Sequence, residues 1–210
     1  MRIGTIDVVY EDDSLLVVDK PAGLLTIPAP DKARRTLTGV LNEYAREQNL
    51  QAALHPCHRL DRETSGLIIY AKGKSMQKKM MQLFKERKVH KTYTAFVQGA
   101  VERQQGEINK QVEGSSALTR FRVLERKSGF TVVEAEPLTG RTNQLRLHFK
   151  AIGHPVLGDY RFAFRRDFAV KAKRLCLHAA KLEFVHPATH REIRLKAGLP
   201  PDLREFLQKH

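Results

Sequence analysis

The sequence predicts an α+β fold built around a largely antiparallel sheet. Strand-like and helix-like segments alternate in mixed order, without the regular βαβ rhythm of a parallel α/β protein. Of the 210 residues, 41% are hydrophobic, which is enough for a core of ordinary size. The chain shows neither an internal repeat nor a low-complexity linker, so we expect one domain, with at most small appendages.

The N-terminal half begins with two short predicted strands, at residues 6–10 and 15–19, around an acidic turn. Residues 20–23 (KPAG) end this pattern, because proline and glycine interrupt regular structure. A helix follows over residues 36–48, where Leu37, Leu41 and Tyr44 recur at helical spacing. After a polar segment, the apolar run at residues 67–71 predicts a buried strand.

The next predicted helix has two contrasting sides. Ser75 is its candidate N-cap, and the apolar side is predicted to carry Met76, Met80, Met81 and Phe84. The other side is basic, and a short basic run follows it. These basic residues are Lys74, Lys78, Lys79, Lys85, Arg87 and Lys88. They fit a solvated face as well as a track that binds phosphates, and both interpretations stay open.

Strands are also expected at residues 91–98, 120–125 and 130–136. Thr142 is the candidate N-cap of a helix that extends through Ile152 and ends at Gly153. Residues 161–174 form a basic loop in which Phe162, Phe164 and Phe168 alternate with cationic residues. A closing hairpin at 182–185 and 192–195 and a terminal helix at 202–208 complete the prediction.

The charge of the chain favours a polyanionic partner. The formal net charge is +14 and the isoelectric point is near 10.0, which makes nucleic acid the default candidate. No apolar run is long enough to span a bilayer, and no signal-peptide core is present, so no membrane partner is expected. Cys57 and Cys176 are the only cysteines, which indicates no disulfide framework and a reduced, cytoplasmic protein.

The stretch HRLDRETSG at residues 58–66 places Asp61 between Arg59 and Arg62. A carboxylate between two guanidinium groups is expected to stay ionised to low pH. It fits three roles: a salt-bridged turn, a metal ligand or a nucleophile. Ser65 and Gly66 let the backbone turn tightly and approach a ligand.

Two further polar clusters suggest chemistry on a nucleobase. Arg141 and Arg146 lie at the start of a predicted helix, where free backbone N–H groups favour a bound anion. Tyr93, in the cluster Lys91-Thr92-Tyr93, offers an aromatic face for a base taken out of its helix. An Asp, an Arg and a Tyr therefore make a minimal site in which the carboxylate acts as nucleophile or base.

The sequence lacks the usual motifs of metal and nucleotide cofactor sites. Several histidines are present, but none has HExxH spacing, and Cys57 with His58 lacks a partner motif. Neither GxxxxGK[ST] nor GxGxxG occurs, so nucleotide hydrolysis and dinucleotide redox chemistry are not indicated. We expect no cofactor and no metal.

Five segments, in order, resemble the RluA-type pseudouridine synthases, which isomerise uridine to pseudouridine within RNA. They are LLVVDKPAGLLT, HRLDRETSGLIIYAK, KTYTAFVQG, GRTNQLRLHFKAIGHPVLGDYRF and RLCLHAAKLEFVHPATHREI. The resemblance implies that Asp61 is the catalytic aspartate, that Tyr93 stacks on the target base and that Arg146 pairs with Asp61. Six basic residues are expected to contact RNA: Arg59, Arg62, Lys91, Arg141, Arg165 and Arg166.

The resemblance also implies the pseudouridine synthase fold, a mixed and mostly antiparallel sheet with a central cleft lined by helices and loops. It predicts a monomer, no cofactor, and tRNA, rRNA or both as substrate. Residues 1–210 are expected to form one catalytic domain without a separate N-terminal RNA-binding domain. One departure is Asn143, where the family usually has a histidine.

Two other functions compete with this interpretation. The first is an RNA-binding or ribosome-assembly factor that keeps the fold without the activity. The second is a metal-dependent nuclease that uses Asp61 and histidines. RNA binding without isomerisation of any RNA would favour the assembly factor. Chelator-sensitive RNA cleavage would favour the nuclease.

Overall fold

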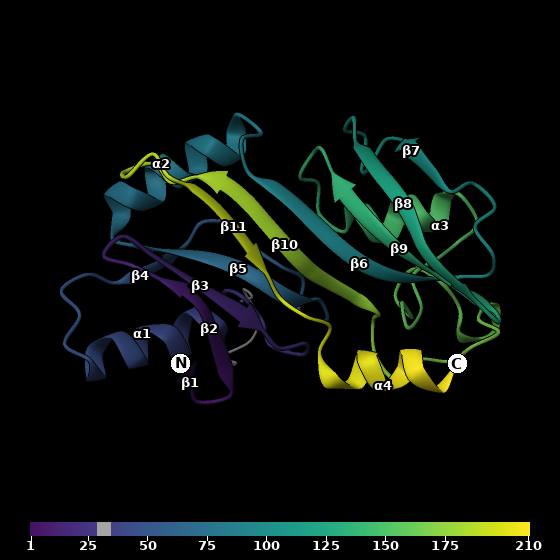
Figure 1. Ribbon diagram of the computed structural model, residues 1–210, viewed down its shortest axis with the longest axis horizontal. Helices are drawn as coiled ribbons and strands as arrows, with labels where there is room; N and C mark the ends of the chain where they lie inside the picture. Colours follow the sequence, from purple (N-terminus) through teal and green to yellow (C-terminus); the bar gives the residue numbers. More distant parts are fainter. Residues whose placement is uncertain (29–34) are drawn as a thin grey trace. The chain divides into compact units, whose positions relative to one another are not determined.

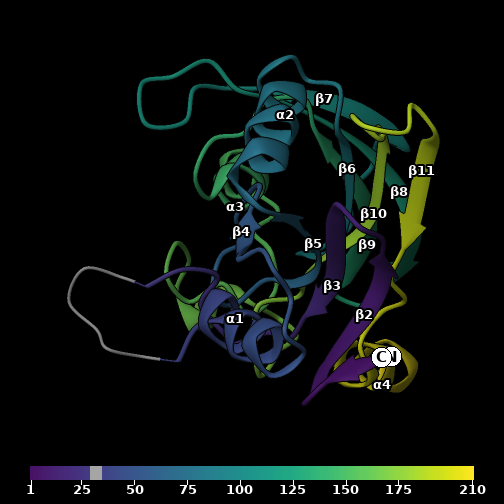
Figure 2. The ribbon, with the colours of Figure 1, turned by 90° about the vertical axis from the view of Figure 1, so that its left-hand side faces the viewer.

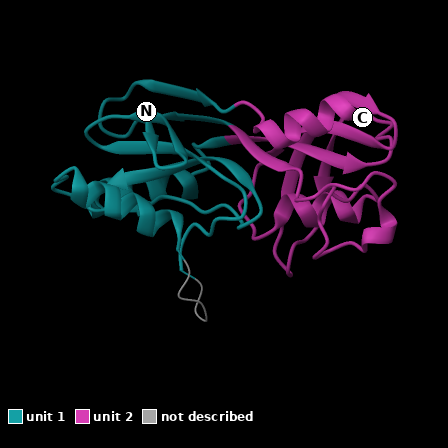
Figure 3. Cartoon of the chain, turned by 90° about the horizontal axis from the view of Figure 1, so that it is seen from below, with its two compact units in different colours: residues 1–90, 181–197 teal, residues 91–180, 198–210 magenta. Residues whose placement is uncertain are grey.

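The computed structural model describes residues 1–28 and 35–210, and the chain folds into two compact units (Figures 1 and 3). Unit 1 comprises residues 1–90 and 181–197, and unit 2 comprises residues 91–180 and 198–210. Each unit therefore combines two separate segments of the chain. The prediction of a single catalytic domain concerns function and stays a prediction.

Unit 1 contains a row of antiparallel strands in the order β1 (Arg2–Ile3), β2 (Ile6–Glu11), β3 (Leu15–Lys20) and β5 (Ser65–Lys72). The short β4 (Leu54–Pro56) also pairs with β5. The predicted closing hairpin is confirmed, because β10 (Leu177–Val185) pairs antiparallel with β11 (Glu192–Lys196). Its register places Leu182 opposite Leu195.

The helices of unit 1 lie on one side of strands β2 and β3 (Figure 2). Helix α1 (Leu37–Glu47) follows Thr36, whose Oγ1 accepts a hydrogen bond from the Gly39 N–H at 3.1 Å. Helix α2 (Lys74–Lys85) buries Met76 and Met80 in the core of the unit. The prediction that Met81 shares this apolar side is wrong, because its side chain is 53% exposed. Both helices were predicted from the period of their apolar residues.

The predicted N-cap of α2, Ser75, is wrong. The helix begins at Lys74, and the capping residue is Gly73, which has φ +94° and no side chain to supply a capping hydrogen bond. The positive φ turns the chain from the end of β5 directly into the helix, and glycine adopts that conformation without strain. Ser75 therefore falls inside the first turn.

Unit 2 contains a second antiparallel row in the order β6 (His90–Gln98), β9 (Phe130–Pro137), β8 (Leu118–Lys127) and β7 (Gln105–Asn109). The strands predicted at 91–98, 120–125 and 130–136 are confirmed, and β7 was missed. The core of unit 2 includes Phe96, Phe130 and Leu157, and Leu203 of α4 (Pro201–Lys209) belongs to the same cluster. The α+β class is thus confirmed.

Helix α3 (Gln144–Ala151) corrects two boundary predictions. Its N-cap is Asn143 rather than Thr142, and Asn143 is in the left-handed region with φ 55°. Asparagine tolerates that conformation better than a β-branched threonine does. Ile152 lies just past the helix as its C-cap, and Gly153, with φ +83°, ends it as predicted.

The basic loop at residues 161–174 carries a single 3₁₀ turn, Arg165–Asp167. Phe168 is buried in the core of unit 2, whereas the Phe164 side chain is exposed. The aromatic residues of this loop thus divide between packing and surface. In the described parts of the chain, we find no helix with the length and hydropathy needed to cross a bilayer.

Candidate active site

The predicted catalytic residue, Asp61, lies in unit 1 on the segment that joins β4 to β5. Its side chain is half-buried, and its backbone carbonyl accepts a hydrogen bond from the Thr64 N–H at 3.1 Å, which closes a tight turn. The loop is shorter than expected, because Ser65 and Gly66 belong to β5. Gly66 has φ +117° and pairs with Lys20 of β3.

The residue before Asp61 is fixed by a buried threonine. Thr26 Oγ1 donates a hydrogen bond to the Leu60 carbonyl at 2.9 Å, and the Leu60 N–H is 3.3 Å from the same oxygen. Both residues are buried. One hydroxyl thus occupies both backbone groups of Leu60, and the peptide unit that leads into Asp61 has little freedom to rotate.

The residue after Asp61 is fixed by the segment that follows β3. The Gly23 N–H donates to the Arg62 carbonyl at 2.8 Å, and Arg62 Nε donates to the Gly23 carbonyl at 3.2 Å. Lys20, fully buried, donates from Nζ to the same Arg62 carbonyl at 3.2 Å. Two more hydrogen bonds, both 2.9 Å, join Lys20 Nζ to the carbonyls of Pro21 and Leu24.

Sequence reasoning missed the roles of Lys20 and Thr26. A buried ammonium is stabilised only when its donors are satisfied, and three carbonyl oxygens do so here. Together the two side chains hold the backbone on each side of Asp61. A signal was present, because the apolar run LLVV at residues 15–18 predicts a strand buried on both faces. Lys20 is the last residue of that strand, directly before Pro-Ala-Gly.

His58, the first residue of HRLDRETSG, joins this segment to α2. Its Nε2 accepts a hydrogen bond from the Ile69 N–H at 3.0 Å. Its ring lies against Phe84, with a centroid separation of 4.9 Å. In a second contact, Gln77 Nε2 donates a hydrogen bond to the Pro56 carbonyl at 2.9 Å. Helix α2 is therefore packed directly on the strand and loop that carry Asp61.

In unit 2, α3 carries Arg146, which is 4% exposed. Its Nη2 and Nε donate to the two carboxylate oxygens of Asp159, at 2.6 and 2.8 Å. Its Nη1 donates to Asn143 Oδ1 at 3.0 Å, and the Phe162 ring lies 4.7 Å from the guanidinium carbon. Three N–H groups are thus directed to Asp159 and Asn143.

Asp159 is a second residue that sequence reasoning missed. It follows Gly158, where φ is +74° and an added Cβ would lie 2.0 Å from the Arg174 carbonyl oxygen. Only glycine fits this position, so the backbone that presents Asp159 is fixed. The Gly-Asp pair in the segment HPVLGDYRF was the available signal.

The polar segment before α3 is held by Gln144. Its Oε1 accepts hydrogen bonds from Thr139 Oγ1 at 2.7 Å and from the Arg141 N–H at 3.0 Å. Its Nε2 donates to the Leu118 carbonyl and to Thr119 Oγ1. All four hydrogen-bonding positions of this amide are used. The result fixes residues 139–144 against β8 and orients the start of α3.

Tyr93 is on β6 in unit 2, where it pairs with Ala135 of β9 and is 8% exposed. On the same strand, burial lowers the pKa of Lys91. Asp61 belongs to unit 1, whereas Tyr93 and Arg146 belong to unit 2. The meeting of all three in one site stays a prediction, as does the pairing of Arg146 with Asp61.

The six residues predicted to contact RNA are distributed over both units. Five are exposed: Arg59, Arg62, Arg141, Arg165 and Arg166. Lys91 is half-buried. Arg166 lies over the Phe164 ring at 5.0 Å, and Arg141 Nε donates to the Ser116 carbonyl at 3.2 Å. The five exposed arginines are accessible to RNA.

Neither cysteine is suited to nucleophilic chemistry. Burial raises the pKa of Cys57 and of Cys176 to about 12, so both thiols are protonated near neutral pH. Over residues 1–28 and 35–210, no three His, Cys, Asp or Glu side chains come together to hold a metal ion. Among the described residues, two arrangements are best suited to catalysis. They are the hydrogen-bonded turn at Asp61 and the buried Arg146–Asp159 ion pair.

Comparisons with known proteins agree with these features. Residues 14–151 match the family model "RNA pseudouridylate synthase". The chain is 36% identical over 98% of its length, and 88% of the relative's, to the dual-specificity RNA pseudouridine synthase RluA of Vibrio cholerae. It is 37% identical to RluA of Pasteurella multocida, with 93% of each chain covered.

A solved structure, Human RNA Pseudouridylate Synthase Domain Containing 4, shares the fold with a TM-score of 0.81 at 26% identity, covering 96% of this chain and 92% of that one. The pseudouridine synthase fold implied by the sequence is therefore confirmed. From the family model, the identity over nearly the whole chain and the shared fold, we conclude that this chain belongs to the RNA pseudouridylate synthase family and is an RNA-modifying isomerase.

Proposed function

We propose that the chain isomerises particular uridines of tRNA, rRNA or both, with Asp61 as the catalytic carboxylate. The observation that carries this assignment is the pair of anchors on either side of Asp61. Leu60 is held by Thr26, and Arg62 is held by Gly23 and Lys20. Prior fixation of a catalytic group lowers the entropy that must be lost on reaching the transition state.

The reaction breaks the N1–C1′ bond of uridine, rotates the uracil and joins its C5 to C1′. The proton on C5 is released and N1 gains one, so nothing is oxidised or reduced. Asp61 attacks C1′ or C6, or removes the C2′ proton to give a glycal, and the residues are compatible with each route. In this proposal the protein works as a monomer, without metal or nucleotide cofactor.

Arg146 is proposed to pair with the Asp61 carboxylate, and Tyr93 to stack on the extruded base. The rigid placement of Arg146 by Asp159 and Asn143 supports this role. The basic residues Arg59, Arg62, Lys91, Arg141, Arg165 and Arg166 are proposed to bind the RNA. The bacterial relatives are named as RNA-modifying enzymes, which supports action in the cytoplasm.

The decisive experiment measures tritium release from RNA labelled at uracil C5. Unmodified tRNA and rRNA are incubated separately with the wild type and with Asp61→Ala. We expect release with the wild type and none with the variant, while RNA affinity stays within about twofold because the carboxylate is not a phosphate ligand. No release from either RNA, together with tight binding, would favour the assembly-factor function instead. Chelator-sensitive cleavage would favour the nuclease.

A further inference from the structure

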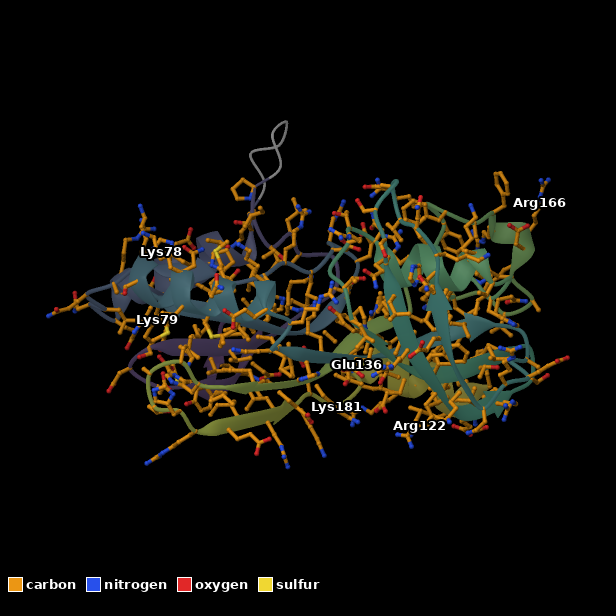
Figure 4. The ribbon with its side chains drawn as sticks, turned by 90° about the horizontal axis from the view of Figure 1, so that it is seen from above. Lys78, Lys79, Arg122, Glu136, Arg166 and Lys181 are labelled. Atoms are coloured by element: carbon orange, nitrogen blue, oxygen red, sulfur yellow. The ribbon has the colours of Figure 1, made fainter. Side chains whose placement is uncertain are left out.

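Helix α2 presents an exposed basic face that the proposed active site does not use. Lys74, Lys78 and Lys85 follow one another at helical spacing, Lys79 lies beside them, and all four are exposed. Figure 4 shows Lys78 and Lys79 on the outside of α2. Met81, which is 53% exposed, lies one turn from both Lys78 and Lys85. We call Lys74, Lys78, Lys79, Met81 and Lys85 the α2 basic face.

The four lysines differ from many other cations of the surface. In the described residues, none of them has a carboxylate within ion-pair distance, and α2 contains no acidic residue. Elsewhere, four exposed cations form ion pairs: Arg2 with Asp7, Arg120 with Glu107, Arg194 with Glu192 and Lys209 with Glu205. The positive charge of the α2 basic face is therefore not neutralised by an ion pair within the protein.

The stability of the helix does not explain this pattern. Lys74 occupies the first turn, where the helix dipole disfavours a cation, and no acidic residue is present there. Lys74 and Lys78 are four residues apart, so they repel each other. The exposed Met81 adds apolar surface within the same patch. Each feature opposes folding or solubility slightly, and each suits contact with a polyanion that also has apolar parts.

The location of α2 connects its basic face to the chemistry. The other side of the helix packs on the segment that carries Asp61, through the His58–Phe84 ring contact at 4.9 Å and the hydrogen bond from Gln77 to the Pro56 carbonyl. Within unit 1, a ligand on this face is thus held by the element that also supports the turn at Asp61.

We infer that the α2 basic face binds the phosphate backbone of the substrate RNA, away from the reacting nucleotide. From Lys74 to Lys85 the helix rises about 16 Å, which is long enough to contact several phosphates of one strand. Each lysine replaces a condensed counterion on a phosphate, and Met81 contacts a ribose or an unstacked base. The inference rests on the proposed function, because it takes the substrate to be RNA.

The test removes the four charges together. The variant Lys74→Gln/Lys78→Gln/Lys79→Gln/Lys85→Gln is compared with a control that loses the same charge from paired positions, Arg2→Gln/Arg120→Gln/Arg194→Gln/Lys209→Gln. For each, the Kd for unmodified tRNA and for rRNA is measured across a range of salt concentrations. Circular dichroism and thermal unfolding show whether both variants are folded.

We expect the α2 variant to weaken RNA binding by more than about tenfold near 0.1 M salt, and to reduce the slope of log Kd against log salt by about three. The control changes the slope by less than about one. A charge-retaining variant with arginine at the same four positions restores the wild-type slope. Equal slopes for the α2 variant and the control, or no restoration by arginine, would overturn the inference.

Two more outcomes distinguish RNA binding by the α2 basic face from isomerisation and from membrane binding. If the wild type binds tRNA or rRNA but releases no tritium, the proposed isomerisation is wrong. The slopes of log Kd against log salt still show whether the α2 basic face binds RNA. Vesicles that contain phosphatidylserine provide the other comparison, because a basic helix face also suits an anionic membrane. Vesicle binding that the α2 variant loses, with RNA affinity unchanged, would overturn the inference in favour of a membrane.

Discussion

Asp159 holds the guanidinium of Arg146 with both of its carboxylate oxygens, at 2.6 and 2.8 Å, and the two side chains are 1% and 4% exposed. The arginine proposed to orient the catalytic carboxylate thus already carries one carboxylate partner. Asp159 sets the plane of the guanidinium. The two parallel hydrogen bonds of this planar contact fix the orientation of the guanidinium.

Removal of the Asp159 charge should destabilise the protein strongly. Asp159→Asn leaves Arg146 buried beside a neutral amide that accepts only one of its two hydrogen bonds. Breaking a buried ion pair in this way costs about 3–5 kcal/mol. Urea unfolding measures the loss. Asp202→Asn is the control, because Asp202 pairs with Arg174 but its side chain is 58% exposed, and we expect a loss below about 1 kcal/mol. Similar losses for both variants would contradict this prediction.

Lys20 should affect both stability and turnover. Lys20→Met keeps most of the side-chain volume but removes the donor for the carbonyls of Pro21, Leu24 and Arg62. Loss of a partner for buried polar groups costs about 1–3 kcal/mol. We also expect a fall in kcat of at least about tenfold in the tritium-release assay, since the backbone after Asp61 loses an anchor. A fall in stability without any change in kcat would limit Lys20 to a structural role.

Asn143 accepts a hydrogen bond from Arg146, and an amide does so at any pH. In Asn143→His, the introduced imidazole accepts that bond only while it is neutral, and the nearby cation holds the pKa of the imidazole below its usual value of about 6.5. The variant should therefore lose activity as pH falls below about 6.5, in addition to any loss that the wild type shows. The ratio of kcat/KM values, variant to wild type, is measured from about pH 5.5 to 8. A ratio that does not change with pH would contradict the proposed contact.

The turn between β2 and β3 should carry part of the stability at neutral pH. Burial raises the pKa of Asp12, but hydrogen bonds from the Tyr10 hydroxyl and from the N–H groups of Ser14 and Leu15 lower it, and the net pKa lies below its ordinary value. The ionised carboxylate is therefore favoured in the folded state. Its contribution is complete above the unfolded pKa of about 3.9 and disappears as pH falls through the folded pKa.

Asp12→Asn tests this dependence. The variant should be less stable than the wild type at about pH 7, and the difference should shrink as the pH is lowered past about 3.9. Urea unfolding at several pH values supplies the comparison, with the exposed neighbour Asp13→Asn as control. A difference that stays constant down to about pH 2 would show that the Asp12 charge contributes nothing.

The period of apolar residues predicted most of the regular elements. Leu37, Leu41 and Tyr44 indicated α1, and alternation at 91–98 indicated β6, because burial of one face imposes that period on the sequence. The short strands β1, β4 and β7 were missed. The β7 sequence, QGEIN, buries only Ile108 and therefore has no alternating apolar pattern. This strand forms because it pairs with β8.

The two wrong N-caps have a related cause. Ser75 and Thr142 are good capping residues, yet Gly73 and Asn143 were selected by backbone φ angles that the approach to each helix requires. Hydrogen-bonding propensity was visible in the sequence, whereas the direction of the incoming chain was not. The same limit hid Lys20, Thr26 and Asp159. Their roles depend on partners up to 42 residues away, and local patterns do not reveal such contacts.

The division of unit 1 into residues 1–90 and 181–197 has a consequence for biosynthesis. Its hydrophobic core includes Leu182 and Phe184, packed with Leu15, Ile69 and Met80. The ribosome makes those five residues in two separate stages, with the greater part of unit 2 between them. Residues 1–90 therefore emerge with exposed apolar surface, and the unit that holds Asp61 completes its core only after residues 181–197 have been made. Nascent chains that stall before residue 185 should be substrates for chaperones rather than folded intermediates.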